Sequence, residues 1–336
     1  EKIGGCSLQG RTNRTGAGIY KRFQVLYPPF GRCIGIRFGK WRGQKMTYDE
    51  FKEKLLEEMG ERLGKPAVKI ITVTKNNNVQ KDAVTLSDCE AELNPVVYLD
   101  DLYKECMAGK KISECVDQIL ELSHGTPEFD SRQLFDSWEE AKDRIELDLA
   151  NTKWNEGLFT DTPHKEFLDL TVYCRLVFAK DETGIASTVV KESMLVRWGI
   201  SEQDMWEAAS SNLKKEAYQF MNLRSLIGKS AKAADIKECR SASMCVLTNP
   251  VMYYGASGIL RTDLLEKLAQ LKETDLYILP SSVHEVILLP ALDCWDMDEL
   301  RQMVKSVNAG SVDKMDWLSD EVYYYRRGSG EAVIAD

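Results

Sequence analysis

The chain has 336 residues, of which 43% are hydrophobic and 29% charged, and its formal net charge is −9. This composition is typical of a globular protein with a sizeable core, and the length predicts two domains or one large one. No stretch approaches the roughly 18 consecutive apolar residues of a membrane helix, and none resembles a secretory signal, so we expect a cytoplasmic protein without a membrane partner.

Residues 1–45 differ in charge from the remainder of the chain. They contain ten Lys and Arg residues and one acid, whereas residues 46–336 contain 34 basic and 52 acidic residues. This Gly-rich segment has no helical or strand period, so it could be a basic arm that binds nucleic acid. The favoured interpretation is that residues 1–45 are disordered or outside the native gene product. Codons for Trp41, Arg42 and Gly43 can contain a purine-rich ribosome-binding sequence just before Met46.

Residues 46–125 are expected to form an N-terminal α+β unit. Thr47 and Glu50 have the spacing of a capping box, and the helix after them has an apolar stripe made by Phe51, Leu55 and Met59. Strands are predicted at 68–74, 83–86 and 96–99, with an asparagine turn at 76–78, and helices at 102–107 and from 110 onward. His-Gly-Thr-Pro at 124–127 is the best candidate boundary.

Residues 126–336 are expected to form the main α+β domain. An amphipathic helix is predicted at 138–149, followed by a central strand at 167–178 and its hairpin partner at 185–190. Further elements are predicted as follows: helices at 194–198, from 201, at 262–271 and at 296–307, and strands at 244–247 and 322–325. Strand pairs and single helices alternate irregularly, which favours an α+β fold. We expect a mixed, largely antiparallel sheet with helices packed against it. A division into two subdomains is the other option.

The stretch from Leu276 to Pro290 is predicted to lie at the centre of this fold. Two apolar runs are separated by Pro-Ser-Ser at 280–282, which is typical of a buried hairpin. If the second strand begins at Val283, His284 and Glu285 lie on opposite faces of the sheet.

Four strings in the chain resemble a domain family of unknown function. They are PHKEFLDL at 163–170, WGISE at 198–202, LPSSVHEV at 279–286 and LSDEVY at 318–323. The family they resemble is encoded by anaerobic Gram-positive bacteria, often near mobile-element genes, and the likeness extends from about residue 46 to about residue 334. It implies no activity, cofactor or catalytic residue.

Chemistry-bearing residues near two of these strings are the candidates for a catalytic site. His164, Glu166, Asp169 and His284 can together hold a divalent metal or perform acid–base catalysis, provided that the segment before residue 167 meets the turn at 281–284. The other interpretation is that both histidines are structural. His284 and Glu285 do not form an HExxH motif, because position 288 is Leu.

Ser282 stands next to His284 and is a candidate nucleophile, although serines of this kind more often hydrogen-bond their own turn. The nine cysteines include no CxxC pair, so we predict reduced thiols and neither a metal nor another cofactor.

The leading functional hypothesis is a non-catalytic binding or accessory protein that acts on a protein partner. The acidic excess after residue 46 argues against a nucleic-acid partner for residues 46–336. The alternative is a metal-dependent or acid–base enzyme, hydrolase-like, that uses His164 and His284.

Overall fold

The computed structural model describes residues 46–63, 68–86, 96–124, 131–181, 184–223, 239–240, 243–292 and 295–336. Residues 1–45 and the predicted boundary after His124 lie outside these ranges. Within them, helices pack against three sheets, and all strand pairs are antiparallel. The predicted α+β fold class is confirmed, although the strands form three sheets rather than one.

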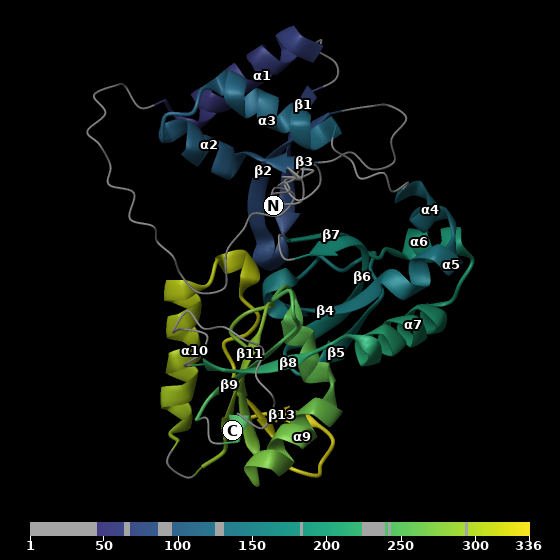
Figure 1. Cartoon of the computed structure of the whole chain (residues 1–336), viewed down its shortest axis with the longest axis vertical. Coiled ribbons are helices and arrows are strands. Elements are labelled where there is room, and N and C mark those ends of the chain that lie inside the picture. Colours follow the sequence, from purple (N-terminus) through teal and green to yellow (C-terminus); the bar gives the residue numbers. More distant parts are fainter. Residues whose placement is uncertain are drawn as a thin grey trace, which may run out of the picture.

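The N-terminal unit has its own sheet (Figure 1). It also has its own apolar core. Thr47 and Glu50 form the predicted capping box, and Phe51, Leu55 and Met59 are fully buried. Its elements are α1 (Tyr48–Leu63), β1 (Val68–Lys75), η3 (Asn76–Asn78), β2 (Val79–Leu86), β3 (Val96–Tyr98), α2 (Leu99–Met107) and α3 (Ile112–His124).

The second sheet has β6 at its centre, with β4 on one side and β5 and β7 on the other. Helices α6 and α7 follow, and α6 ends at Gly199, whose positive φ of 68° suits a residue without Cβ. The elements are α4 (Ser131–Asp136), α5 (Trp138–Ala141), η4 (Lys142–Arg144), β4 (Ile145–Asn151), η5 (Lys153–Asn155), β5 (His164–Phe167), β6 (Leu170–Asp181), β7 (Gly184–Val189), α6 (Glu192–Trp198) and α7 (Glu202–Lys215).

Two predictions for this sheet are wrong. The helix predicted at 138–149 ends by Arg144, and Ile145 begins strand β4. Ile145, Leu147 and Leu149 alternate with acidic residues, and this period of two matches β4 once the strand pairs with β6. The strand predicted at 167–178 is divided by a turn, in which Leu168 has a φ of 57°, so β6 begins at Leu170.

The third sheet has the strand order β13-β12-β10-β11-β9-β8. Its two central strands are the hairpin predicted at residues 276–290, so that prediction is confirmed. Strands β8 and β13 were not predicted. The elements are β8 (Gln219–Asn222), β9 (Cys245–Thr248), η7 (Gly255–Leu260), α9 (Thr262–Lys272), β10 (Leu276–Leu279), β11 (Val286–Pro290), α10 (Met297–Ser311), η8 (Lys314–Asp316), β12 (Tyr323–Tyr325) and β13 (Ala332–Ile334).

Two boundaries in the third sheet differ from prediction. Strand β11 begins at Val286, because the Ser282 hydroxyl accepts the His284 N–H at 3.0 Å and keeps this segment in a turn. His284 and Glu285 therefore precede the strand and do not occupy its opposite faces. Helix α10 continues past the predicted stop at Asn308, whose buried amide donates to Ser319 O and Asp320 Oδ1.

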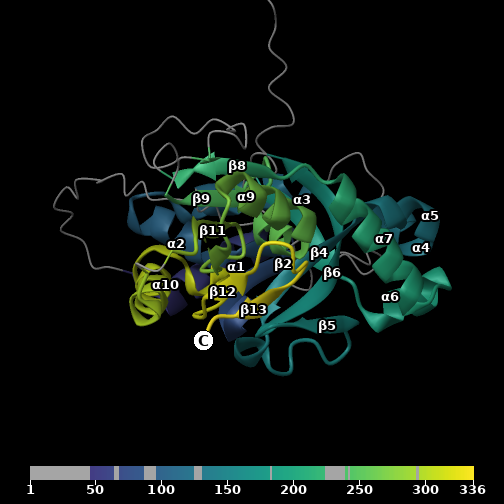
Figure 2. The same cartoon turned by 90° about the horizontal axis from the view of Figure 1, so that it is seen from below.

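The largest core lies between the second and third sheets, and α10 covers a smaller core on the far side of the third sheet. Figure 2 shows α10 on one side of β12 and β13, with α6 and α7 on the other. Figure 1 shows the β1–β2 hairpin reaching from the N-terminal unit toward these two sheets. No helix in the described ranges has both the length and the apolar character needed to span a bilayer.

Candidate functional site

A cavity of about 470 Å³ lies where the N-terminal unit meets the second and third sheets. Small-molecule sites commonly have volumes of roughly 300–1,000 Å³. The hairpin tip forms one wall, β6 and β7 form another, and segments next to β9, β11 and β12 form the third. Its lining includes four aromatic side chains, Tyr98, Phe159, Tyr173 and Tyr254, and four cationic ones, Lys75, Lys81, Arg175 and Lys191.

The polar wall follows from the two-residue period of the second sheet. Tyr173 of β6 pairs with Asp148 of β4, and Arg175 pairs with Val189 of β7, so these side chains share one face. Cys174, between them in the chain, points the other way into the main core. A strand that is apolar on one face therefore brings a tyrosine and an arginine to the cavity on the other.

Arg175 and Asp148 form an ion pair that is almost completely buried. Arg175 Nε lies 3.2 Å from Asp148 Oδ2, and their side chains are 5% and 1% exposed. The Tyr173 hydroxyl donates to the same carboxylate oxygen at 2.6 Å, and Arg175 Nη1 donates to Ser187 Oγ at 3.2 Å. Arg175 Nη2 is buried and has no hydrogen-bond partner among the described residues; Nε makes no hydrogen bond there either.

Burial and charge act in opposite directions on Arg175. Burial lowers the pKa of its guanidinium, but Asp148, together with smaller contributions from Tyr254, Tyr173 and Glu146, raises the pKa overall. Burial, followed by the charge of Asp148, raises the pKa of Tyr173 well above its usual value. The site therefore holds a permanent guanidinium cation beside a neutral phenol.

Tyr254 covers one face of the guanidinium. Its ring centroid lies 3.4 Å from Arg175 Cζ, which is a close cation–π stack. Tyr254 has a φ of 55°, a left-handed conformation that costs an aromatic residue roughly 1–2 kcal/mol. Gly255 follows it, and a Cβ there would lie only 2.7 Å from His284 O, so the turn requires glycine. The packing thus holds Tyr254 in a strained conformation that stacks its ring on Arg175.

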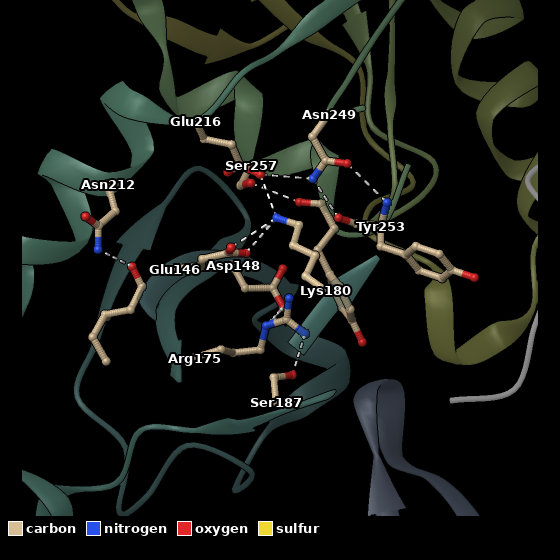
Figure 3. A network of polar contacts seen from close by, with 12 residues as sticks. Glu146, Asp148, Arg175, Lys180, Ser187, Asn212, Glu216, Asn249, Tyr253 and Ser257 are labelled. Carbon is tan, nitrogen blue, oxygen red and sulfur yellow. Dashed lines mark hydrogen bonds and ion pairs between the residues drawn. The ribbon is translucent and has the colours of Figure 1, made fainter. Parts of the chain in front are cut away.

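A second polar network holds this turn in place (Figure 3). Lys180 Nζ lies 2.9 Å from Glu146 Oε2 and 2.7 Å from Glu216 Oε1. Glu216 accepts a hydrogen bond from the Asn249 amide, which also donates to Tyr253 O. The network therefore connects β4 and β6 to the residue that precedes Tyr254.

The three lysines of the cavity differ in their pairing. Lys81 Nζ lies 2.9 Å from Asp100 Oδ2, and Lys191 Nζ lies 2.6 Å from Asp161 Oδ1. Lys75 has no carboxylate within 4 Å among the described residues, and its ammonium lies 4.7 Å from the centroid of the Tyr98 ring. Burial lowers the pKa of Lys75, and the charge of Arg175 lowers it further. Lys75 is thus the cavity cation without a carboxylate partner in the described chain.

The hairpin tip is attached to the other two walls through asparagine amides. Asn77 Nδ2 donates to Lys314 O at 2.7 Å and to Trp317 O at 2.8 Å. The backbone N–H of Asn77 donates to Asn155 Oδ1, and the Asn155 amide donates back to Asn77 Oδ1. Asn77 has a φ of 59°, which Asn tolerates better than most residues. These bonds fix the position of Lys75, two residues earlier.

A family model covers residues 48–327, a span that contains all residues that line the cavity. The chain belongs to DUF5688, a family of unknown function. The resemblance to a domain family of unknown function, predicted from the four sequence strings, is thereby confirmed. No curated protein and no solved structure matches the chain.

Three of the predicted candidates, on β5 and in the turn after it, lie at separate places in the DUF5688 fold. His164 is exposed, and its Nδ1 donates to Thr162 O at 2.8 Å. Glu166 is exposed on the same strand. Asp169 instead joins two sheets, because it accepts hydrogen bonds from Ser319 Oγ at 2.7 Å and from the Tyr323 hydroxyl at 2.5 Å.

The candidates before β11 form a second group. His284 Nδ1 accepts the Tyr254 N–H at 3.3 Å, and its Nε2 lies 3.5 Å from Asp316 Oδ1. Burial lowers the pKa of His284, but Asp316 raises it more, so the pKa is raised overall. Glu285 is buried with Oε2 unpartnered among the described residues, and burial raises its pKa. Ser282 is buried and uses its hydroxyl in the turn.

The two groups of candidates do not meet in one site. Among the described residues, no three His, Cys, Asp or Glu side chains are arranged to hold a metal ion. None of the six candidates lines the cavity of this DUF5688 chain. His284 touches its wall only indirectly, through Tyr254 and Asp316. The sequence patterns do not single out Arg175, Asp148 or Lys75, although Arg175 is the only charge between Leu170 and Phe178, which is a signal in itself.

Proposed function

We propose that this protein is a non-catalytic binding protein of the bacterial cytoplasm and that a small anion occupies its cavity. The observation that carries the proposal is the buried Arg175 guanidinium, which lines the cavity with Nη2 unpartnered among the described residues. An unsatisfied buried donor costs roughly 1–3 kcal/mol, and an anionic acceptor would remove that cost. The planar fork of arginine matches a carboxylate or phosphate group.

Binding is favoured over catalysis by the composition of the cavity wall. Its described residues include no histidine or cysteine, the side chains most often used as bases and nucleophiles near neutral pH. The alternative remains a metal-dependent or acid–base enzyme that uses His164 and His284. Near-stoichiometric metal in the purified protein, lost on replacing either histidine with alanine, would support that alternative.

The wider role of the protein is also a proposal. Its ligand-bound form would act on a protein partner, as an accessory factor of a mobile element. This part rests on the family resemblance noted in the sequence, and the acidic excess after residue 46 favours protein over nucleic acid as the partner.

The anion site can be tested by titrating the full chain with small carboxylates and phosphates while recording amide NMR spectra. We expect shifts in residues around Arg175. Val189→Trp should weaken them by occupying part of the cavity, whereas Val196→Trp should not, because Val196 is 81% exposed on α6. The proposal fails if no anion causes shifts, or if Val189→Trp leaves them unchanged in a folded protein.

A further inference from the structure

We infer that the ligand is a monoanionic aromatic carboxylate that bridges Arg175 of the second sheet and Lys75 of the N-terminal unit. This inference rests on the proposed anion-binding function and adds to it the charge, the shape and the bridging position of the ligand.

The charge follows from the pairing of the groups around the cavity. Lys81 and Lys191 are each neutralised by an aspartate, and Arg175 lies beside Asp148. Asp316 contributes a further negative charge to the wall, next to His284. Lys75 is then the cation left without a carboxylate in the described chain, so the site suits one negative charge better than the two of a phosphate monoester.

The aromatic part follows from an apolar cluster that faces the cavity and is separate from the main core. Phe159 and Tyr173 form it with Ala150, and their ring centroids are 4.9 Å apart. Tyr98 and Tyr254 add two further rings to the lining. A cavity of about 150 Å³ holds benzene, so 470 Å³ leaves space for a fused two-ring system together with its carboxylate.

The bridging position follows from the origin of the lining residues. Lys75 and Tyr98 belong to the N-terminal unit, whereas Arg175 and Tyr173 come from the second sheet, and Phe159 from the loop between β4 and β5. A ligand between Lys75 and Arg175 contacts both parts of the chain, and its binding stabilises the docking of the hairpin.

The inference can be tested by calorimetric titration of the full chain with four probes. They are 2-naphthoate, acetate, 2-naphthalenemethanol and 2-naphthyl phosphate. We expect 2-naphthoate to bind at least about tenfold more tightly than acetate, which lacks the rings, and than the alcohol, which lacks the charge. It should also bind more tightly than the naphthyl phosphate.

Two variants locate the ligand. Lys75→Met removes the ammonium, keeps most of the length of the side chain, and should weaken binding of 2-naphthoate about tenfold. Lys69→Met, at an exposed position of the same strand, should leave binding unchanged. Phe159→Leu should weaken 2-naphthoate several-fold without affecting acetate. Circular dichroism and thermal unfolding establish that each variant is folded.

The outcomes separate this inference from the proposed function. If acetate or the naphthyl phosphate binds as tightly as 2-naphthoate, the ligand class is wrong while anion binding stands. If Lys75→Met binds 2-naphthoate like the unaltered chain, the bridge is wrong. If no carboxylate or phosphate binds at all, the proposed function fails and the inference fails with it.

Discussion

The pair of Arg175 and Asp148 shows how much one buried charge depends on another. Replacing Asp148 with alanine leaves the guanidinium buried without its counter-ion, and we expect the free energy of unfolding to fall by about 3–5 kcal/mol. The control is Asp136→Ala, which breaks the exposed pair with Arg197 and should cost less than about 1 kcal/mol. Urea unfolding measures both changes. Equal losses in the two variants would contradict the assigned role of Asp148.

His284 makes stability depend on pH through Asp316. Because the pKa of His284 is raised in the folded protein, its contribution is complete below the unfolded value of about 6.5 and is lost as pH rises through the folded value. Asp316→Asn removes the main cause of the raised pKa, so it should destabilise the protein more near about pH 6 than near about pH 8. Urea unfolding at both pH values tests this.

Glu285 makes stability depend on pH in the same direction as His284 does. It is present both in the unaltered protein and in Asp316→Asn. Burial raises its pKa, so its contribution is complete below an unfolded value of about 4.5 and is lost as pH rises through the folded one. An NMR titration of the His284 ring in both proteins isolates the histidine. If the pKa of His284 is unchanged in Asp316→Asn, Asp316 is not the cause of its raised value.

Single residues were predictable from sequence where the signal is local. The cap at Thr47 depends on Glu50, three positions later, and it forms. That Lys75 and Arg175 line one cavity depends on how two sheets dock, and no local pattern contains that information. The six site candidates were selected for their chemistry, whereas the cavity is built from residues that only strand register brings together.

At the scale of elements, the turn η3 attaches the N-terminal unit to the other two sheets. Asn77→Gly keeps the left-handed backbone available but removes the amide that donates to Lys314 O and Trp317 O. We expect a loss of about 2–3 kcal/mol and faster amide hydrogen exchange at residues 74–78. Asn78→Gly is the matched control, because Asn78 has a similar φ of 54° and its exposed amide donates only to Trp154 O among the described residues. Equal exchange in both variants would show that Asn77 does not hold the turn.

The central hairpin of the third sheet should tolerate no polar residue. Ile278 is fully buried in the main core, and Ile287 packs against the core under α10. Ile278→Ala should cost about 2–5 kcal/mol, and Ile287→Asp should leave little folded protein against a typical total of roughly 5–15 kcal/mol. Val333→Asp, on edge strand β13, is the control with a small expected effect. Thermal unfolding of the variants tests this. If Ile287→Asp is as stable as the unaltered protein, β11 lies at the surface.

Elements were predictable where a single period fitted the residues. The segment from Trp138 to Leu149 fits two, because its apolar residues are spaced for a helix while Ile145, Leu147 and Leu149 alternate as in a strand. Pairing with β6 decides between them, and that is a long-range effect. Strands β8 and β13 have only four and three residues, too few to show a period.

At the scale of the whole molecule, the α+β class was predictable but the division into three sheets was not. The prediction rested on which segments are strands, whereas the sheets depend on which strands pair. β8 and β9 are separated by more than twenty residues and still lie side by side at the end of the third sheet. The cavity exists only because the N-terminal sheet docks against the other two, so it could not be predicted either.

The last prediction concerns residues 1–45. We expect a chain that begins at Met46 to unfold at the same temperature as the full chain, because Met46 and Thr47 already make contacts that hold α1. The Tyr103 hydroxyl donates to Met46 O at 2.9 Å, and Thr47 caps the helix with Glu50. As a comparison, Thr47→Ala in the shortened chain should remove about 1 kcal/mol and lower the Tm by roughly 2–4 °C.

Differential scanning calorimetry of the three proteins measures this. A Tm lower by many degrees in the chain that begins at Met46 would show that residues 1–45 belong to the fold.

Electrophoretic mobility of a DNA duplex tests the other interpretation of the same segment. If residues 1–45 are an arm that binds nucleic acid, the full chain retards the duplex at low salt and loses it at high salt, because binding by counterion release weakens with salt. The shortened chain, with 34 basic and 52 acidic residues, should then not bind at all.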